Sequence, residues 1–391
     1  MQKLILILAA CTLSSWGMSY TQFRDYTLKH SPLLKSRALN VKKADITNAI
    51  DLRAENPVLT LEGSRFDPDD ARKSYEYAVA LTQSIRTPWY MEGIRQKSRA
   101  NTLLAQAFKT QGHAGYLKTL ENLYTEYVFQ SRLLLLLKSE YRLSKRIAQM
   151  VKERYESGSE NKVAYLQART QTLSLKTQLY TTKQQRDTLY YQLLAVAGIE
   201  KNVSLQQRFI YPVSPVTKTS AKRSAQQQIL DAKERLYRSE LLMNKSGFRN
   251  FDLYSSLEKE PDQSVIRVGV NIPLSINNDR TEERMLAKLR MQQIALESRQ
   301  LAVSLKMRKE MLKSAIGELS QQYRALKSLQ KEQKELVALL EEGYRIAKGS
   351  LFQLMSEKQK RIETQKALLQ TQKMINIKKI ELRFLQGDYN D

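Results

Sequence analysis

One arrangement of landmark residues occurs twice in this sequence, once in each half. Each half contains a proline, a tyrosine closely followed by a glycine, and a final glycine. The proline and tyrosine are 67 residues apart in the first half and 71 in the second, and 43 residues separate the tyrosine from the final glycine in both. A match of this kind is the signature of a duplicated structural unit. The landmarks are Pro88, Tyr155 with Gly158, and Gly198, and then Pro273, Tyr344 with Gly349, and Gly387.

The stretches between these landmarks have the period of long helices. Apolar residues recur at alternating spacings of three and four residues, which predicts helices packed side by side in coiled-coil fashion. Only 13 Gly and 8 Pro interrupt the 391 residues. At 1.5 Å per residue, a helix of about 67 residues is roughly 100 Å long, so it must pack along other long helices. The stripes are Leu117, Leu120, Tyr124 and Tyr127, and Leu312, Ile316, Leu319, Tyr323 and Leu326.

Each half also carries two short stretches that alternate between apolar and polar residues, which predicts strands. We expect hairpins that pair residues 57–66 with 74–86 and residues 248–257 with 264–273. Their tips are the turn formers Asp67-Pro68-Asp69-Asp70 and Glu260-Pro261-Asp262. Strands of about ten residues with one apolar face are typical of transmembrane β-barrels. A soluble hairpin with one core face is the usual alternative, but no soluble core is evident for four strands attached to 100 Å helices.

The sequence therefore predicts a mainly α protein with a small β part, built as two repeats. We expect a signal peptide over residues 1–19, a first repeat over 20–199, an irregular equatorial linker over 200–225 and a second repeat over 226–391. Within the first segment, Leu8-Ala9-Ala10-Cys11 fits a lipoprotein processing site and Gly17-Met18-Ser19 fits an ordinary one. We expect cleavage at the second site, because the chain between Cys11 and a helix beginning at Tyr20 is too short to reach a membrane about 50 Å away.

Composition argues against several functional classes. The chain has only two His residues and one Cys, which are too few to favour a metal site or a Cys/His catalytic pair. We see no phosphate loop, nucleophile elbow or paired catalytic acids, and we predict that the chain is not an enzyme and holds no cofactor. The net charge of +24 could suggest nucleic-acid binding, but Lys and Arg are scattered along helical faces, so we do not expect that partner.

Several short motifs carry a family resemblance. The chain resembles the TolC-like outer-membrane efflux proteins from about residue 20 to residue 388. Asn56-Pro57-Val58-Leu59 resembles that family's entry to its first strand, and Asn271-Ile272-Pro273-Leu274 is similar to the exit from its last. Arg154-Tyr155-Glu156-Ser157-Gly158, followed by Leu166-Gln167-Ala168, resembles a helix-hairpin tip of the family.

The resemblance implies a homotrimer in the outer membrane of a Gram-negative bacterium. Three copies of four strands would form one β-barrel in contact with outer-membrane lipid, and the long helices would continue it as an α-barrel in the periplasm. The function implied is a passive export duct of a tripartite efflux or type I secretion system. Its partners would be a periplasmic adaptor, or membrane fusion protein, and an inner-membrane pump of the RND or ABC type. The alternative is a periplasmic coiled-coil adaptor or scaffold without a membrane barrel.

The resemblance also assigns candidate site residues. The residues implied to dock the adaptor lie at the hairpin tips: Tyr155, Gly158, Ser159, Tyr344, Gly349 and Ser350. The periplasmic entrance falls on Ala164, Gln167, Gln353 and Ser356, where family members often place aspartate. None of these four is acidic, so an acidic, cation-selecting gate is not expected. Junctions between strands and helices fall at Pro57, Pro88 and Pro273.

Overall fold

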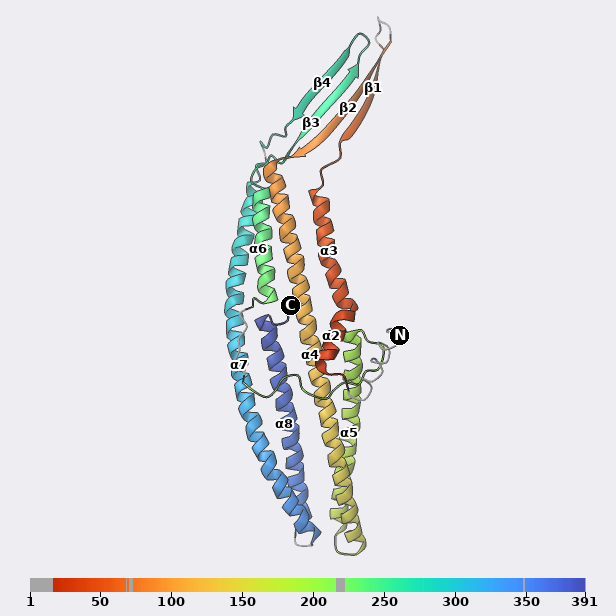
Figure 1. The fold of residues 1–391 in the computed structure, drawn as a ribbon, viewed down its shortest axis with the longest axis vertical. Helices are drawn as coiled ribbons and strands as arrows, with labels where there is room; N and C mark the ends of the chain where they lie inside the picture. Colours follow the sequence, from red (N-terminus) through yellow and green to blue (C-terminus); the bar gives the residue numbers. More distant parts are fainter. Residues whose placement is uncertain are drawn as a thin grey trace, which may run out of the picture. The chain divides into compact units, whose positions relative to one another are not determined.

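A computed structural model describes residues 17–67, 69, 73–215, 222–276, 278–346 and 349–390. From α3 and from α6 onward its elements follow one order: a helix, two strands, a very long helix and a helix of 36 residues (Figure 1). The first half has α2 (Tyr20–His30), α3 (Pro32–Leu52), β1 (Val58–Phe66), β2 (Ser74–Arg86), α4 (Pro88–Glu156) and α5 (Lys162–Ala197). The second has α6 (Ala225–Met243), β3 (Asn250–Lys259), β4 (Ser264–Asn271), α7 (Thr281–Arg345) and α8 (Leu351–Gln386).

The predicted fold class is confirmed: the protein is mainly helical, with one four-stranded antiparallel sheet in the order β1-β2-β3-β4. The four predicted strands lie within two residues of their expected ends. Contacts divide the chain into two compact units, each of which draws on both halves. The first unit contains residues 1–35, 112–224 and 305–391, and the second contains residues 36–111 and 225–304.

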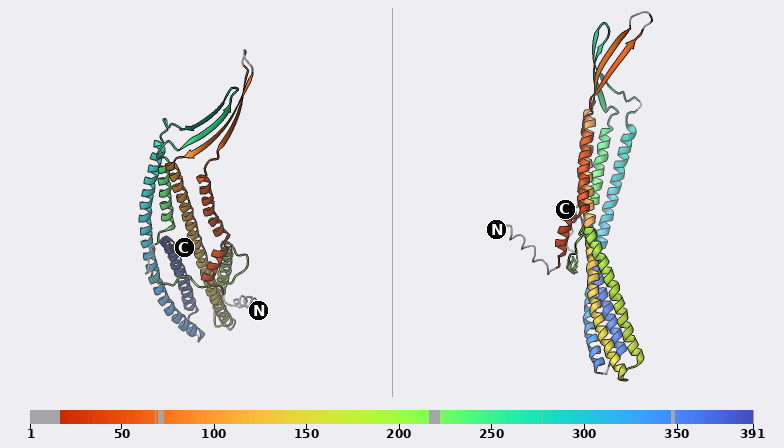
Figure 2. Two further views of the ribbon diagram at one scale, coloured as in Figure 1. Left: turned by 45° about the horizontal axis from the view of Figure 1, so that its top comes forward. Right: turned by 90° about the vertical axis from the view of Figure 1, so that its right-hand side faces the viewer.

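The second unit contains the sheet, which Figure 2 shows as a single curved layer. Its apolar face is open. Leu61 pairs with Val79, Val79 with Leu257 and Leu257 with Ile266, so one row of apolar side chains crosses all four strands. These four side chains are 70%, 44%, 53% and 73% exposed, respectively. The predicted apolar-out arrangement is therefore present on every strand.

The opposite face of the sheet is polar and more covered. Thr60, Ala80, Ser256 and Arg267 form the neighbouring row across the strands, and Arg267 makes an ion pair with Glu258 on β3. Below the sheet, helices of this unit approach closely: a side chain at Gly93 of α4 would overlap Met243 of α6. A helix long and apolar enough to cross a membrane does not occur in the described part of the chain.

The first unit contains α5, α8 and the C-terminal parts of α4 and α7, which pair as two helical hairpins, α4 with α5 and α7 with α8 (Figures 1 and 2). The predicted stripes face its core: Leu120, Tyr124, Leu312 and Ile316 are all buried. Gly198 and Gly387 end α5 and α8 in the left-handed conformation, with φ of 68° and 78°. Glycine tolerates this conformation because it has no Cβ.

The irregular segment that follows α5 is bound to the helices by buried polar groups. Asn376 of α8 is fully buried, and its side-chain amide accepts from the backbone N–H of Tyr211 at 2.8 Å and donates to the Tyr211 carbonyl at 3.1 Å. Lys379 donates to the Pro212 carbonyl at 2.8 Å, and burial lowers the pKa of this lysine. The linker is thus held against α8 at Tyr211 and Pro212.

Residues 1–16 of the predicted signal segment lie outside the described residues, but its last residues take part in the fold. The backbone N–H of Met18 donates to the Ser204 carbonyl at 2.7 Å, and that of Gln206 donates to the Met18 carbonyl at 3.0 Å. Ser19 caps α2 and forms a capping box with Gln22. A chain that begins after residue 19 would lose this backbone bridge and this cap.

Candidate functional site

The two hairpin tips reach the same end of the first unit and differ in their turns (Figure 1). At the α4–α5 tip, Gly158 has a φ of +77°, and nothing lies within 4 Å of where its side chain would be. The backbone N–H groups of Ser159 and Glu160 both donate to the Arg154 carbonyl, at 2.8 and 3.1 Å. Asn161 then caps α5 by accepting from the backbone N–H of Ala164 at 2.8 Å. A β-branched residue at position 158 would be strained by its φ alone.

The α7–α8 tip is shaped by close backbone packing. A side chain at Gly349 would lie 2.8 Å from the Tyr344 nitrogen and 2.9 Å from the Gly343 carbonyl carbon. Ser350 begins α8 in an extended conformation but makes no side-chain cap. Glycine is thus required at this tip by lack of space, and at the first tip by φ. This difference agrees with the sequence, in which Gly158 follows Tyr155 by three residues and Gly349 follows Tyr344 by five.

A contact between the two hairpins joins the tips to each other. The Arg154 guanidinium donates to the Tyr344 carbonyl at 2.9 Å and lies 4.4 Å from the centre of the Tyr344 ring. The Tyr344 hydroxyl donates to Glu160 at 3.1 Å. Burial, together with the charge of Glu160, raises the pKa of Tyr344. Tyr344 is thus held by a cation and an anion that both come from the other hairpin.

Apolar packing supports this contact. Tyr344 is 2% exposed and belongs to a cluster of buried residues from all four helices. The predicted tip residue Tyr155 is partly exposed and stacks on Tyr165 of α5, with ring centres 5.6 Å apart. The cluster contains Ile147, Val151, Ala164, Ala168, Val337, Tyr344, Leu351 and Leu354.

The four entrance candidates take different positions. Ala164 belongs to the buried cluster, whereas Gln167 and Gln353 are exposed and Ser356 is partly exposed. Of the nearby acids, Glu160 accepts from Tyr344 and Glu357 accepts from Lys360 at 2.7 Å. At the other end of the long helices, Pro57 directly precedes β1, Pro88 is the first residue of α4, and Pro273 follows β4.

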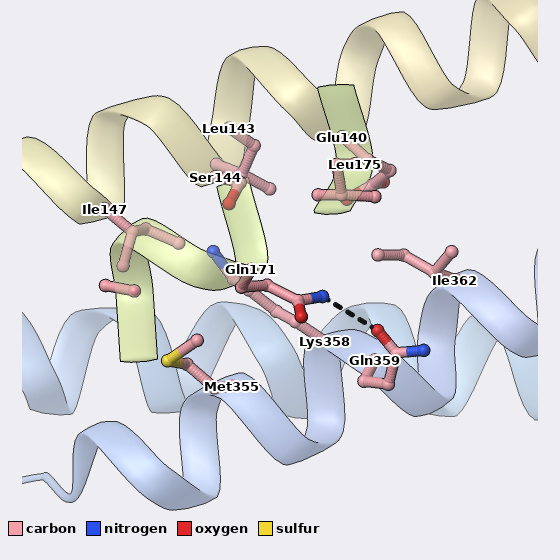
Figure 3. Close-up of a pocket in the computed structure, with 11 residues that line it drawn as sticks. Glu140, Leu143, Ser144, Ile147, Gln171, Leu175, Met355, Lys358, Gln359 and Ile362 are labelled. Carbon is pink, nitrogen blue, oxygen red and sulfur yellow. Dashed lines mark hydrogen bonds between the residues drawn. The ribbon is translucent and has the colours of Figure 1, made fainter. Parts of the chain in front are cut away.

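A small cavity with a mainly apolar lining lies near the tips between α4, α5 and α8 (Figure 3). Its volume is about 30 Å³, which is enough for about one water molecule. Gln171 donates to Gln359 across it at 2.9 Å. Lys358 lines the cavity and is 7% exposed, and it forms an ion pair with Glu341 of α7 at 3.4 Å. Burial lowers the pKa of Lys358.

A second buried ion pair lies beside this cavity. Arg361 of α8 donates to both carboxylate oxygens of Glu140 on α4, at 2.8 and 3.1 Å. Both side chains are largely buried. Among the described residues no group of His, Cys, Asp or Glu is arranged to hold a metal ion. The ion pairs of this region join helices to one another.

Sequence reasoning did not assign roles to Arg154, Lys358 or Arg361. Arg154 was visible as part of the tip motif, but its partner Tyr344 lies 190 residues away. Lys358 follows Leu354 by four residues on α8, so both lie on the same face of the helix. This spacing was the sequence pattern that could have predicted a buried cation.

Comparisons with known structures identify the fold. The outer-membrane channel OprN superposes with a TM-score of 0.81 at 13% identity, covering 95% of this chain and 90% of OprN. CusC, solved in a study of transmembrane channel formation, gives 0.79 at 14% identity, covering 94% and 91%. The outer membrane protein VceC of Vibrio cholerae gives 0.78 at 12% identity, covering 94% and 95%. No family model and no curated protein sequence matches this chain. The chain has the fold of these outer-membrane proteins.

Proposed function

We propose that this chain, which has the fold of outer-membrane channels, is itself the outer-membrane channel of a tripartite efflux or type I secretion system. It would form a homotrimer, with its sheets in the outer membrane and its helical hairpins in the periplasm. It would act as a passive duct, docking a periplasmic adaptor that connects it to an RND or ABC pump. No catalytic step is part of this function.

The exposed apolar face of the sheet carries the proposal. The row Leu61, Val79, Leu257 and Ile266 is open on all four strands. In a soluble protein such a continuous apolar surface would be covered by other elements. Lipid supplies the cover in a membrane, and the polar opposite face would then line a water-filled interior. The outer strands β1 and β4 have unpaired edges in the single chain, which copies of the chain would satisfy by closing a barrel.

Docking is assigned to the tips, at Tyr155, Gly158, Ser159, Tyr344, Gly349 and Ser350. The support is that these residues lie in two adjacent turns, in which Tyr155, Ser159 and Ser350 have exposed side chains. Tyr344 is buried, and its contacts with Arg154 and Glu160 join the two turns. Gln167, Gln353 and Ser356 have exposed or partly exposed side chains close to these turns, so they remain candidates for the entrance lining. Ala164 would support the entrance from the core side.

The test compares charges on the two faces of the same strands. Leu61→Arg and Ile266→Arg place a charge on the apolar face, and Thr60→Arg with Val265→Arg places one on the opposite face. An arginine facing lipid costs about 2–4 kcal/mol at mid-membrane depth. We expect the first pair to abolish recovery of trimer from the outer membrane and the second pair to retain it. Equal recovery of both, or recovery of the wild-type chain in the soluble periplasm, would contradict the proposal and favour a periplasmic scaffold.

A further inference from the structure

The side of α4 that the linker covers continues toward the tip as an uncovered face. The Tyr124 hydroxyl and the Arg132 side chain donate to linker carbonyl groups at 2.6 and 2.9 Å. Lys138 and Arg146 each follow one of these residues by 14 positions, which is almost four helical turns. They therefore lie on the same side of α4 as the linker contacts, but both of them are exposed.

This uncovered face of α4 is polar and basic. Six of residues 138–149 are exposed, and all six are polar. The carboxylates nearby on α4 have other partners. Glu140 pairs with Arg361, and Glu153 accepts from Gln149 at 2.9 Å. The exposed residues are Lys138, Ser139, Arg142, Lys145, Arg146 and Gln149. We call the four cations the α4 row, and within the described part of the chain none of them makes an ion pair.

The second repeat carries an equivalent row on α7. An offset of 189 residues relates the two tip tyrosines, Tyr155 and Tyr344. The same offset relates Ser131 to Ser320, which are 2% and 1% exposed, so the two helices bury the same face at that level. Seven residues beyond each serine, on the same face of the helix, lies an exposed lysine. Lys138 corresponds to Lys327, Arg142 to Lys331 and Lys145 to Lys334, and Arg324 completes what we call the α7 row.

The α7 row also keeps a net positive charge. Among the described residues none of its four cations makes an ion pair, and the nearby Glu341 pairs with Lys358 of α8 instead. Glu332 and Glu335 lie beside the row, next to Lys331 and one turn from it. These two carboxylates reduce the charge of the row without cancelling it.

The two rows lie at the same height above the tips. Arg154 donates to the Tyr344 carbonyl, so the ends of α4 and α7 lie at one level. Lys138 and Lys327 each precede the tip tyrosine of their helix by 17 residues, which is about 25 Å at 1.5 Å per residue. The rows therefore form one level of positive charge on the helices of the first unit.

The composition of the rows indicates the kind of partner they fit. Five of the eight cations are lysines, and no exposed apolar residue lies within the α4 row. Protein interfaces bury aromatic and apolar side chains at their centre and are depleted in lysine. A hydrated polymer with many negative charges needs no apolar contact, because it binds through ion pairing and the release of counterions. The rows therefore fit a polyanion better than the surface of a folded protein.

We propose that the α4 row and the α7 row bind peptidoglycan, a periplasmic polymer whose peptides carry carboxylates. This inference rests on the proposed channel, in which the linker side of the helices faces the periplasm, because a linker on the inner side would obstruct the duct. Three copies would present the rows around the duct at one level. Several carboxylates of one polymer mesh would then bind at once, which raises the overall affinity.

The test measures sedimentation of the full-length, detergent-extracted protein with purified peptidoglycan sacculi. Neutralising six cations of the rows is expected to weaken binding at least tenfold and to leave the trimer intact. A matched control neutralises six exposed cations of the second unit and should bind within twofold of the wild type. The row variant carries Lys138→Gln, Arg142→Gln, Arg146→Gln, Lys327→Gln, Lys331→Gln and Lys334→Gln. The control variant carries Lys42→Gln, Lys43→Gln, Arg53→Gln, Arg99→Gln, Lys288→Gln and Arg299→Gln.

Two measurements on the wild-type protein keep the proposal testable if the row variant does not fold. Amidation of the sacculus carboxylates should abolish sedimentation of the protein. Salt at about 0.5 M should release the bound protein, because the screening length then falls to about 4 Å.

The outcomes separate this inference from the proposed channel. A wild-type trimer that does not sediment with sacculi, or whose binding survives amidation, would overturn the inference and leave the channel standing. The same holds if the row variant binds sacculi normally, including the case in which it loses only capture of an adaptor or of anionic phospholipid vesicles. A wild-type chain recovered as a soluble periplasmic monomer would instead contradict the channel.

Discussion

At the scale of single residues, one buried carboxylate organises the middle of the first unit. Glu121 of α4 is 2% exposed and accepts from three phenols that come from different segments. Tyr20 donates at 3.1 Å and Tyr211 at 2.7 Å, and Tyr389 donates as well. The opening helix, the linker and the end of the chain are thus joined to α4 at a single side chain.

This cluster predicts a loss of stability at alkaline pH. Burial, then the charge of Glu121, raises the pKa of Tyr20, Tyr211 and Tyr389 above 10.0. In the unfolded chain these groups ionise near their ordinary pKa, so above about pH 10 the unfolded state binds fewer protons than the folded state. Stability must therefore fall as the pH rises through that value. Thermal unfolding followed by circular dichroism at pH 8, 10 and 11 should show a falling Tm.

The control for this prediction is Glu121→Gln, which keeps an acceptor and removes the charge. Because that charge raises the pKa of all three phenols, the decline in Tm should be shallower in the variant. Removing the acceptor altogether with Glu121→Leu should cost about 3 kcal/mol at pH 8, since buried hydroxyls would lose their partner. A Tm that does not change between pH 8 and 11 in the wild-type protein would contradict this assignment.

At the scale of elements, the long helices of the first unit are joined by buried ion pairs as well as by apolar packing. Lys358 of α8 and Glu341 of α7 form one such pair, in which the lysine is far less exposed than its partner. We expect Glu341→Ala to lower stability by about 3 kcal/mol, because it leaves a buried cation unpaired. Lys358→Met should cost less, because it removes the buried charge itself. Denaturant unfolding of both variants and of the double variant would measure this order, and the opposite order would refute it.

The two tip glycines give a second prediction at this scale. Valine at position 158 adds about 1–2 kcal/mol of backbone strain at a left-handed φ, and valine at 349 would push against the Tyr344 backbone. Both changes should abolish export while leaving the trimer intact. Gly158→Asn is the matched control, because asparagine tolerates this φ, and export should be retained. Export is measured as resistance or secretion in cells, and trimer as a detergent-stable band; loss of the trimer would make the tips structural and remove the docking assignment.

At the scale of the whole molecule, charge determines whether cations should bind inside the proposed duct. The chain carries a net +24, and the acids nearest the tips already have partners, Tyr344 for Glu160 and Lys360 for Glu357. We therefore expect that multivalent cations do not block conductance, since a strong cation site would need a ring of free carboxylates. Planar-bilayer recording tests this. Block by micromolar trivalent cations that disappears in Glu160→Gln or Glu357→Gln would show an acidic gate.

Local sequence patterns determined most of the elements of this protein. Alternation over ten residues fixes which strand face is apolar, because successive side chains point to opposite sides. Heptad spacing identified Leu120, Tyr124, Leu312 and Ile316 as core, and single glycines marked the ends of α5 and α8 at Gly198 and Gly387. These features depend on neighbours a few residues away, so they can be predicted from the sequence before the fold is known.

Only the tertiary structure decided how distant segments meet. It buried Ala164, which the sequence placed among entrance candidates, and it brought Arg154 to Tyr344 and three tyrosines to Glu121. These outcomes depend on contacts between segments far apart in the chain, 190 residues for Arg154 with Tyr344 and 268 for Tyr389 with Glu121. The period of a helix defines its apolar face but not the element that packs on that face.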